Sequence, residues 1–293
     1  MDPSRATYIA PSTFTDGKLT RAWIWSYANP AIFSDGLGEM DKRHPELNVD
    51  TMDPEAYPNL FFTDRHGIEV ALDLITSSTP RSLTYIALGP LTTFTQLIRQ
   101  HGDVVKSRIG QVVCMGGNLD VPGNTSAVAE CECFEKVSYP ERLIFTATVN
   151  FFADPFAVKE LLTPSSPAEG FPLDRFILLP LDVTTPHEIP FPYYKEHIDP
   201  AFKDTTQPSD ATKKAPLIHF TSAFLERTRE VMLLFGKDAM ELHDIVAVWC
   251  AVENPPPSDA ELAAAISTPV LSKKWKTVRR RFQVERSVAI HSA

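Results

Sequence analysis

The chain has 293 residues with a formal net charge of -9 at neutral pH, and 43% of its residues are hydrophobic. This length allows a large buried core, and we expect residues 1–293 to form a single α/β domain. The acidic balance argues against a nucleic-acid surface, because phosphate binding needs clustered Lys and Arg, and no apolar stretch reaches the roughly 18 residues of a membrane span.

The four cysteines are too few for a disulfide framework in a chain of this length. The first residues contain no apolar run of signal-peptide length. We therefore expect a reducing, cytoplasmic location. Cys131 and Cys133 are spaced for a metal in principle, but no second Cys/His pair lies nearby in the sequence, so a zinc site there is the weaker interpretation.

The predicted elements begin after a segment that is hard to assign. Residues 1–30 are poorly assignable, and the sequence up to about residue 60 is rich in Pro, Asp, Asn and Ser. Beyond this point, short apolar runs alternate with segments of helical periodicity. In chain order we predict a helix over His66–Thr76, a strand over Ser82–Leu88, a helix over Thr92–Gln100, a strand over Gln111–Met115, a helix over Pro155–Leu162 and a strand over Phe176–Leu181.

Strands that alternate with helices are typical of a mainly parallel central sheet with helices on both faces, and this is the fold class we predict. Two more helices follow the last strand. The first covers Pro216–Phe235 and ends at Gly236. The second covers Leu242–Val252. One side of the first helix is predicted to be apolar and to carry Phe220, Phe224, Val231 and Leu234.

A polar loop follows the predicted strand Gln111–Met115, at the end of the strand where open α/β sheets bind ligands. Asn124 on this loop and Asn150 further on each offer a donor and an acceptor, while Glu130 only accepts. The three side chains suit vicinal hydroxyls such as those of a ribose. The competing interpretation is a glycine turn followed by an Asn/Thr helix cap.

Six short motifs occur in order along the chain. They are DGLG from Asp35, ALGPLT from Ala87, MGG from Met115, GNTSAVAE from Gly123, NFFADP from Asn150 and LHDIVAVW from Leu242. Together they resemble the nucleoside hydrolase family of the inosine-uridine preferring type. The resemblance extends from about Ile32 to about Arg286, which is most of the chain.

The resemblance implies an enzyme that hydrolyses the N-glycosidic bond of ribonucleosides to a free base and ribose. It also implies a Ca²⁺ ion, held by the Asp244 carboxylate and the Leu88 backbone carbonyl, since calcium accepts six to eight oxygen ligands. Members of the family are commonly homodimers or homotetramers, so a homo-oligomer is expected. For Asp154 we favour a simpler role, the cap of the helix that begins at Pro155.

The same resemblance assigns the polar residues to the substrate. Asn124, Glu130 and Asn150 would hold ribose hydroxyls. His243 would be the general acid towards the leaving base, because imidazole groups titrate near neutral pH. Taken alone, His243-Asp244 also fits a helix cap, and the neighbouring motifs favour the site.

The sequence departs from the family pattern in several places. No DxDxxxDD motif occurs in these residues, although this loop supplies most of the carboxylates around Ca²⁺ and the base that activates water. Ile32-Phe33-Ser34 stands where the family has His-Gly, and the sequence ends at SVAIHSA, short of the usual terminal strand. We therefore expect a sheet without its first βα unit and an impaired hydrolase, from an incomplete gene model or a decayed paralogue. The alternatives are a non-catalytic nucleoside-binding or ribose-binding pseudoenzyme and a fragment that does not fold.

Residues 131–149 interrupt the family pattern AEFN between Glu130 and Asn150. The codons for Cys131-Glu132 can contain a splice-donor-like GTGAG, and those for Thr148-Val149 an acceptor-like CAG. Joining across them leaves one Phe codon and restores AEFNFFADP in frame. Our hypothesis is a retained intron, and the competing interpretation is a genuine surface loop.

Overall fold

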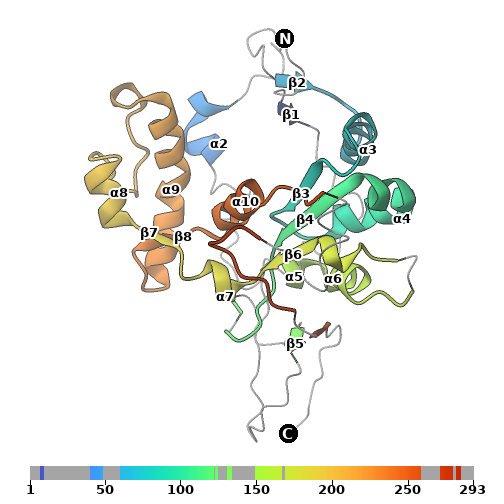
Figure 1. Cartoon of the computed structure of the whole chain (residues 1–293). Coiled ribbons are helices and arrows are strands. Elements are labelled where there is room, and N and C mark those ends of the chain that lie inside the picture. Colours follow the sequence, from blue (N-terminus) through green and yellow to red (C-terminus); the bar gives the residue numbers. More distant parts are fainter. Residues whose placement is uncertain are drawn as a thin grey trace, which may run out of the picture. The chain divides into compact units, whose positions relative to one another are not determined.

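The computed structural model describes residues 7–9, 40–48, 60–121, 123–124, 131–133, 149–166, 169–258, 271–279 and 282–284 (Figure 1). The chain divides into two compact units. Unit 1 comprises Met1–His66 and Glu188–Leu242, and unit 2 comprises Gly67–His187 and His243–Ala293. The expected single domain over residues 1–293 stays a prediction. The DGLG motif at Asp35 lies outside the described residues.

Unit 2 is built on a three-stranded parallel sheet. Its strands are β3 (Leu83–Ala87), β4 (Ile109–Met115) and β6 (Phe176–Leu179), in the order β3-β4-β6. In the register, Cys114 lies between Ala87 and Leu178. Because the strands are parallel, their carboxyl ends share one edge of the sheet. The predicted α/β fold with a parallel sheet is confirmed.

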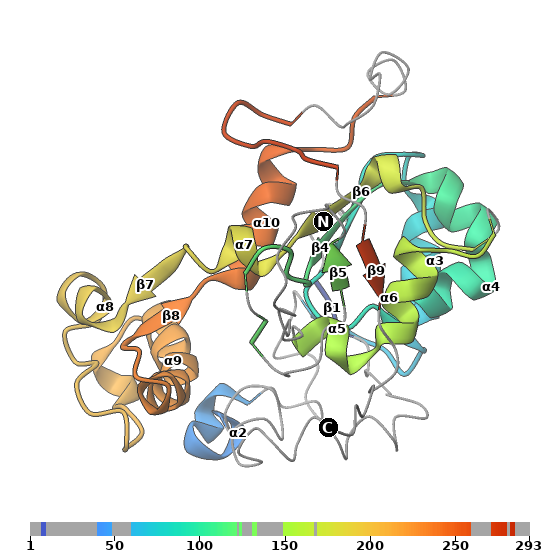
Figure 2. The ribbon, with the colours of Figure 1, turned by 90° about the horizontal axis from the view of Figure 1, so that it is seen from below.

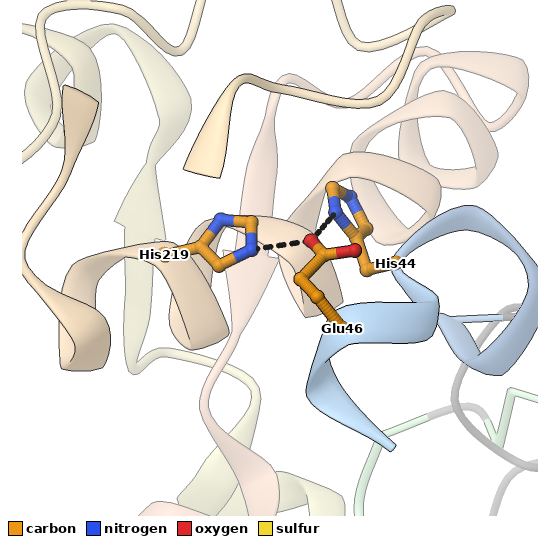
Figure 3. A group of neighbouring side chains, drawn as sticks. All are labelled: His44, Glu46 and His219. Atoms are coloured by element: carbon orange, nitrogen blue, oxygen red, sulfur yellow. Dashed lines mark hydrogen bonds and ion pairs between the residues drawn. The ribbon is translucent and has the colours of Figure 1, made fainter. Parts of the chain in front are cut away.

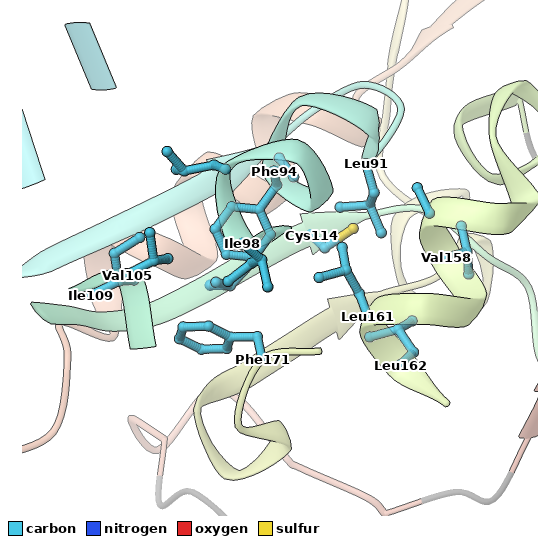
Figure 4. Packing of buried hydrophobic residues seen from close by; sticks show 14 of the residues in the cluster. Leu91, Phe94, Ile98, Val105, Ile109, Cys114, Val158, Leu161, Leu162 and Phe171 are labelled. Atoms are coloured by element: carbon cyan, nitrogen blue, oxygen red, sulfur yellow. The ribbon is translucent and has the colours of Figure 1, made fainter. Parts of the chain in front are cut away.

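Helices cover both faces of this sheet. All seven residues of β4 are buried, as expected for a central parallel strand. Val112 and Cys114 pack into a core with residues of the helices on one face (Figure 4). Gln111 points to the other face, where its amide donates to the Asn254 carbonyl just after the last helix. The helices on the first face are α3 (Gly67–Ser77), α4 (Thr92–Arg108) and α6 (Pro155–Leu162), and α10 (His243–Glu253) lies on the second (Figure 2).

These elements closely match the predicted ones. The helix from Pro155 ends at Leu162, and the one from Thr92 continues to Arg108 across a non-helical residue, His101. Shorter elements connect them at the carboxyl edge of the sheet and before β6. These are α5 (Val149–Ala153), the 3-10 turn η5 (Leu173–Arg175) and α7 (Leu181–Thr184).

The expected insertion begins with a short strand. β5 (Cys131–Cys133) pairs antiparallel with β9 (Phe282–Val284), so Glu132 lies opposite Gln283. Residues 134–148 lie outside the described residues. The origin of the segment 131–149 stays a hypothesis.

Unit 1 contains short strands and helices around a hydrophobic core of Phe191, Tyr194, Phe202 and Leu225. Two pairs of strands occur, one parallel (β1 with β2) and one antiparallel (β7 with β8). In the described part of the chain, no helix is long and apolar enough to cross a membrane. In chain order the elements are β1 (Thr7–Ile9), α2 (Met40–Arg43), the 3-10 turn η3 (Pro45–Leu47), β2 (Leu60–Phe62), β7 (Glu188–Pro190), α8 (Phe191–His197), the 3-10 turn η6 (Ala211–Lys213), α9 (Pro216–Leu234) and β8 (Ala239–Glu241).

The long helix α9 has the predicted extent but buries a different face. Of the side chains predicted to line its apolar side, Phe220 and Leu234 are 49% and 77% exposed. The buried face instead carries His219, Ser222, Ala223, Leu225 and Glu226. Phe224 packs against the unit 1 core as predicted, but the predicted apolar side was wrong at Phe220 and Leu234. Polar side chains are buried on this helix because hydrogen bonds and ion pairs compensate the cost of burying them. One example is Ser222, whose hydroxyl donates to Asp199 at 2.6 Å.

Candidate functional site

Asn150 joins the carboxyl ends of two strands of the unit 2 sheet. Its side-chain nitrogen donates to the Leu88 carbonyl at 3.2 Å, after β3, and to the Met115 carbonyl at 2.9 Å, at the end of β4. Two predicted site residues, Asn150 and Leu88, are therefore in direct contact. The amide oxygen of Asn150 takes no part in these two bonds, so it can accept a hydrogen bond from a ligand.

The two glycines after β4 are explained by the ring of Phe151. Gly116 and Gly117 both have positive φ angles, 156° and 77°. A Cβ atom on Gly116 would lie 2.6 Å from Phe151 Cε1, and one on Gly117 would lie 3.0 Å from Phe151 Cε2. Only glycine lets the backbone turn here against the ring, which belongs to the residue after Asn150. The MGG motif thus fixes where Asn150 lies.

The short helix α7 holds the loop that follows the glycines. The Asp182 carboxylate accepts from the backbone N–H of Leu119 at 2.8 Å and of Asp120 at 2.6 Å. The backbone N–H of Leu181 donates to the Gly117 carbonyl at 2.9 Å. Three hydrogen bonds therefore attach the start of the polar loop to α7.

The same helix contacts His243. Thr184 Oγ1 and His243 Nδ1 share a hydrogen bond of 2.8 Å, and Thr184 is fully buried. His243 is the first residue of α10, which also contacts β3 and β4. The start of α10 and the loop after β4 thus both contact one four-residue helix.

The remaining predicted residues are placed less completely. Asn124 lies exposed in a bend further along the same loop. Glu130 lies outside the described residues, so its role as a ribose ligand stays a prediction.

Asp182 and Thr184 were not predicted as site residues. The available signal was the polar run Asp182–Thr185 directly after the strand that ends the predicted sheet, where ligand-binding residues gather.

Asp154 is the cap of α6, as favoured from the sequence. Its carboxylate accepts from the backbone N–H of Ala157 at 2.9 Å, and its other oxygen accepts from the Thr92 hydroxyl at 2.6 Å. These bonds tie the start of α6 to the start of α4. Each carboxylate oxygen of Asp154 therefore accepts a hydrogen bond that stabilises the fold.

The electrostatics of Asp244 matter for any cation. Although the residue keeps solvent-exposed surface, neighbouring protein atoms partly desolvate the carboxyl and raise its pKa above its ordinary value, while the charge of His243 acts in the opposite direction. In the described part of the edge, the oxygens predicted for calcium are the Asp244 carboxylate and the Leu88 carbonyl. The latter already accepts from Asn150. Since calcium takes six to eight oxygens, these two residues do not make a complete calcium site.

Comparison with known proteins identifies a family. A family model described as inosine-uridine preferring nucleoside hydrolase matches residues 18–289. A relative of that description from Leishmania major is 37% identical over 82 residues, covering 27% of this chain and 26% of the relative. One from Crithidia fasciculata is 33% identical over 90 residues, covering 30% and 27%. The matched stretches therefore span about a quarter of the relatives' own length.

Two nucleoside hydrolases of known structure are among the proteins that this chain resembles. A purine-preferring ribonucleoside hydrolase from Gardnerella vaginalis has a TM-score of 0.45 and 19% identity, with 65% of this chain and 48% of that chain covered. An inosine-uridine preferring nucleoside hydrolase from Bacillus anthracis has a TM-score of 0.40 and 16% identity, with 68% and 51% covered. The chain spans about half the length of these proteins.

Proposed function

The chain belongs to the inosine-uridine preferring nucleoside hydrolase family, and we propose that the carboxyl edge of β3, β4 and β6 recognises a ribonucleoside. One observation supports this most directly. The helix α7 contacts both the loop after β4, through Asp182, and the start of α10, through Thr184. Polar groups from separate parts of the sequence are thereby brought to the edge where α/β sheets bind ligands.

Each predicted residue has a role that suits its chemistry. Asn124, Glu130 and Asn150 would bind the ribose hydroxyls through amide and carboxylate groups. Asn150 is best supported, because its contacts with Leu88 and Met115 fix its orientation. His243 would face the base, and the Thr184 hydroxyl on Nδ1 would set the direction of the ring.

The reaction implied by the family is hydrolysis of the N-glycosidic bond. A water oxygen bonds to the anomeric carbon of the ribose while the bond to the base breaks, and the base leaves with the electron pair. Positive charge grows on the sugar, and a proton given to the base by His243 would ease its departure. The water must also lose a proton, which in the family is the task of the DxDxxxDD loop. The 293-residue sequence has no such motif, so we propose that this polypeptide turns over nucleosides slowly.

The test measures binding and turnover separately on the purified chain. Inosine and uridine are titrated by calorimetry, with added Ca²⁺ and with a chelator, and release of free base is followed by chromatography. We expect saturable binding with little release of base. Rapid release that the chelator abolishes would contradict the proposed impairment. No binding of either nucleoside under any condition would contradict the proposed function.

Variants locate the binding site. Asn150→Asp turns an N–H donor into a carboxylate that faces two carbonyl oxygens, so we expect weaker nucleoside binding and lower stability. His243→Ala removes the proposed contact to the base and should weaken binding by tenfold or more, a loss of about 1.4 kcal/mol. His101→Ala is the matched control, since His101 lies in α4 away from the carboxyl edge. Equal effects of the two histidine variants would argue against the site.

A non-catalytic nucleoside-binding protein is the second candidate. The observation that favours it is the incomplete calcium set, in which the Leu88 carbonyl already accepts from Asn150. This candidate predicts the same affinity with Ca²⁺ and with chelator, and no base release on long incubation. Affinity that rises with Ca²⁺ would favour the impaired hydrolase instead.

A further inference from the structure

Unit 1 contains a compact group of metal-ligating side chains that the nucleoside site does not use. His44 follows α2, Glu46 lies in η3 and His219 lies in the first turns of α9 (Figure 3). Glu46 Oε1 is 3.2 Å from His44 Nδ1 and 2.8 Å from His219 Nε2. One ligand atom from each of the three residues lies within 4.8 Å of the others. In Figure 3 both rings point to the same carboxylate.

The far side of His44 is held by a second, buried carboxylate. Glu226 is 1% exposed, and its Oε2 lies 3.0 Å from His44 Nε2. The same oxygen accepts from Arg43 at 3.1 Å, and the other oxygen accepts from the backbone N–H of Ser209 at 3.0 Å. A carboxylate on the distal nitrogen of a metal-binding histidine fixes its tautomer and orientation. His44 has such a partner.

Counting hydrogens on His44 shows why a cation fits here. An ionised carboxylate only accepts hydrogen bonds, and carboxylates face both ring nitrogens of His44. A neutral imidazole carries one hydrogen, and in the tautomer with this hydrogen on Nε2 it is donated to Glu226. Nδ1 then presents a lone pair towards the lone pairs of Glu46 Oε1. A metal ion between these two atoms would accept both lone pairs.

We propose that His44 Nδ1, His219 Nε2 and a carboxylate oxygen of Glu46 form a zinc site. Two imidazoles with one carboxylate are a common zinc ligand set, whereas calcium prefers oxygen ligands throughout. Around a tetrahedral zinc, neighbouring ligand atoms lie roughly 3.3 Å apart. The two separations from Glu46 Oε1, 3.2 Å and 2.8 Å, need to open by about half an ångström or less, and the ligand atoms of His44 and His219 already lie within 4.8 Å of each other. Glu46 is 44% exposed, which gives the ion a route from solvent and leaves a fourth position for water.

The charges of the neighbouring groups are balanced for a cation. Arg43 offsets the buried charge of Glu226, and it also lies 3.7 Å from Glu230. Glu46 then contributes the negative charge next to the two imidazoles. The proposal does not depend on the nucleoside site, which lies in unit 2.

The experiment is a zinc titration of the purified full chain after chelator treatment. Zinc is added in competition with a chromophoric chelator, and cobalt is used in parallel for its visible spectrum. We expect one equivalent of zinc, a higher melting temperature with zinc, and a cobalt spectrum without thiolate charge-transfer bands. His44→Ala, His219→Ala and Glu46→Gln should each weaken zinc binding by tenfold or more. Glu226→Gln removes the partner of a ligand and should weaken it by about 10–100-fold.

Two controls make the result decisive. His197→Ala removes an exposed histidine of the same unit, and a Cys131→Ser/Cys133→Ser variant removes the other plausible zinc ligands. Both should bind zinc as the unmodified chain does. Because Glu46 is partly exposed, Glu46→Gln should keep the fold, which circular dichroism checks. Loss of zinc binding only in the cysteine variant, unchanged binding in Glu46→Gln, or no binding by the unmodified chain would overturn the proposal.

Discussion

Replacing Gly116 with alanine inserts a methyl group into the ring of Phe151. The new Cβ would lie 2.6 Å from Cε1 and 2.8 Å from Cδ1 of that ring, far inside contact distance, at a residue whose φ is 156°. The backbone conformation costs about 1–3 kcal/mol for a residue other than glycine. Overpacking against a ring that is 1% exposed adds about 1–3 kcal/mol. We therefore expect Gly116→Ala to lower the free energy of unfolding by about 2–6 kcal/mol.

The assay is urea unfolding followed by circular dichroism, in which a loss of this size lowers the midpoint by about 1 M or more. Gly89→Ala is the matched control, because an added Cβ there meets nothing within 4 Å, and its stability should change by less than about 1 kcal/mol. Combining Gly116→Ala with Phe151→Leu should cost less than the sum of the single changes, by about 1 kcal/mol. Equal stability of the Gly116 and Gly89 variants would refute the argument.

Three other predictions follow from single contacts. Hydrogen bonds to the Glu253 carboxylate, of which the one from Lys274 has the largest effect, lower its pKa to about 2. The carboxyl thus loses its proton more readily in the folded state than in the unfolded state. Its contribution to the free energy of unfolding is therefore present above about pH 4.5 and is lost as the pH falls towards 2. Glu253→Gln should therefore destabilise at pH 6 but not at pH 2, by thermal melting. Thr184→Val removes the hydroxyl on His243 Nδ1, which should cost about 1 kcal/mol and weaken inosine binding severalfold by calorimetry. Burial raises the pKa of Cys114 to about 12, so mass spectrometry should find this thiol unmodified by iodoacetamide at pH 7 until the protein unfolds.

The sequence was most informative where hydrophobic periodicity and local stop signals agree. The strand through Val112 and the helix from Pro155 to Leu162 were predicted almost to the residue, because each has a clear apolar pattern and a defined start. The family resemblance, drawn from ordered motifs, is confirmed by the match over residues 18–289. The role of Asp154 as a cap also follows from local chemistry, since it precedes a proline.

Tertiary contacts explain what the sequence did not reveal. The face that α9 buries depends on partners such as Glu46, which hydrogen-bonds His219 across 173 positions of the sequence. A periodicity argument sees Phe220 and Leu234 as the apolar side and has no information on the carboxylates that compensate buried polar groups. For the same reason, Thr184 was not predicted as a site residue, although its hydroxyl shares a hydrogen bond with His243 Nδ1.

The origin of residues 131–149 and the geometry of the carboxyl edge are separate questions. Asn150 is held by Leu88 and Met115, and the ring of the next residue packs against Gly116, so its position depends on contacts with residues outside the segment. Deleting 131–149 and placing one Phe before Asn150 should therefore leave these contacts in place while bringing Glu130 within two residues of Asn150. A transcript sequenced across the junction that still contains codons 131–149 would contradict the intron hypothesis. It would leave the edge unchanged, because no contact that positions Asn150 comes from that segment among the described residues.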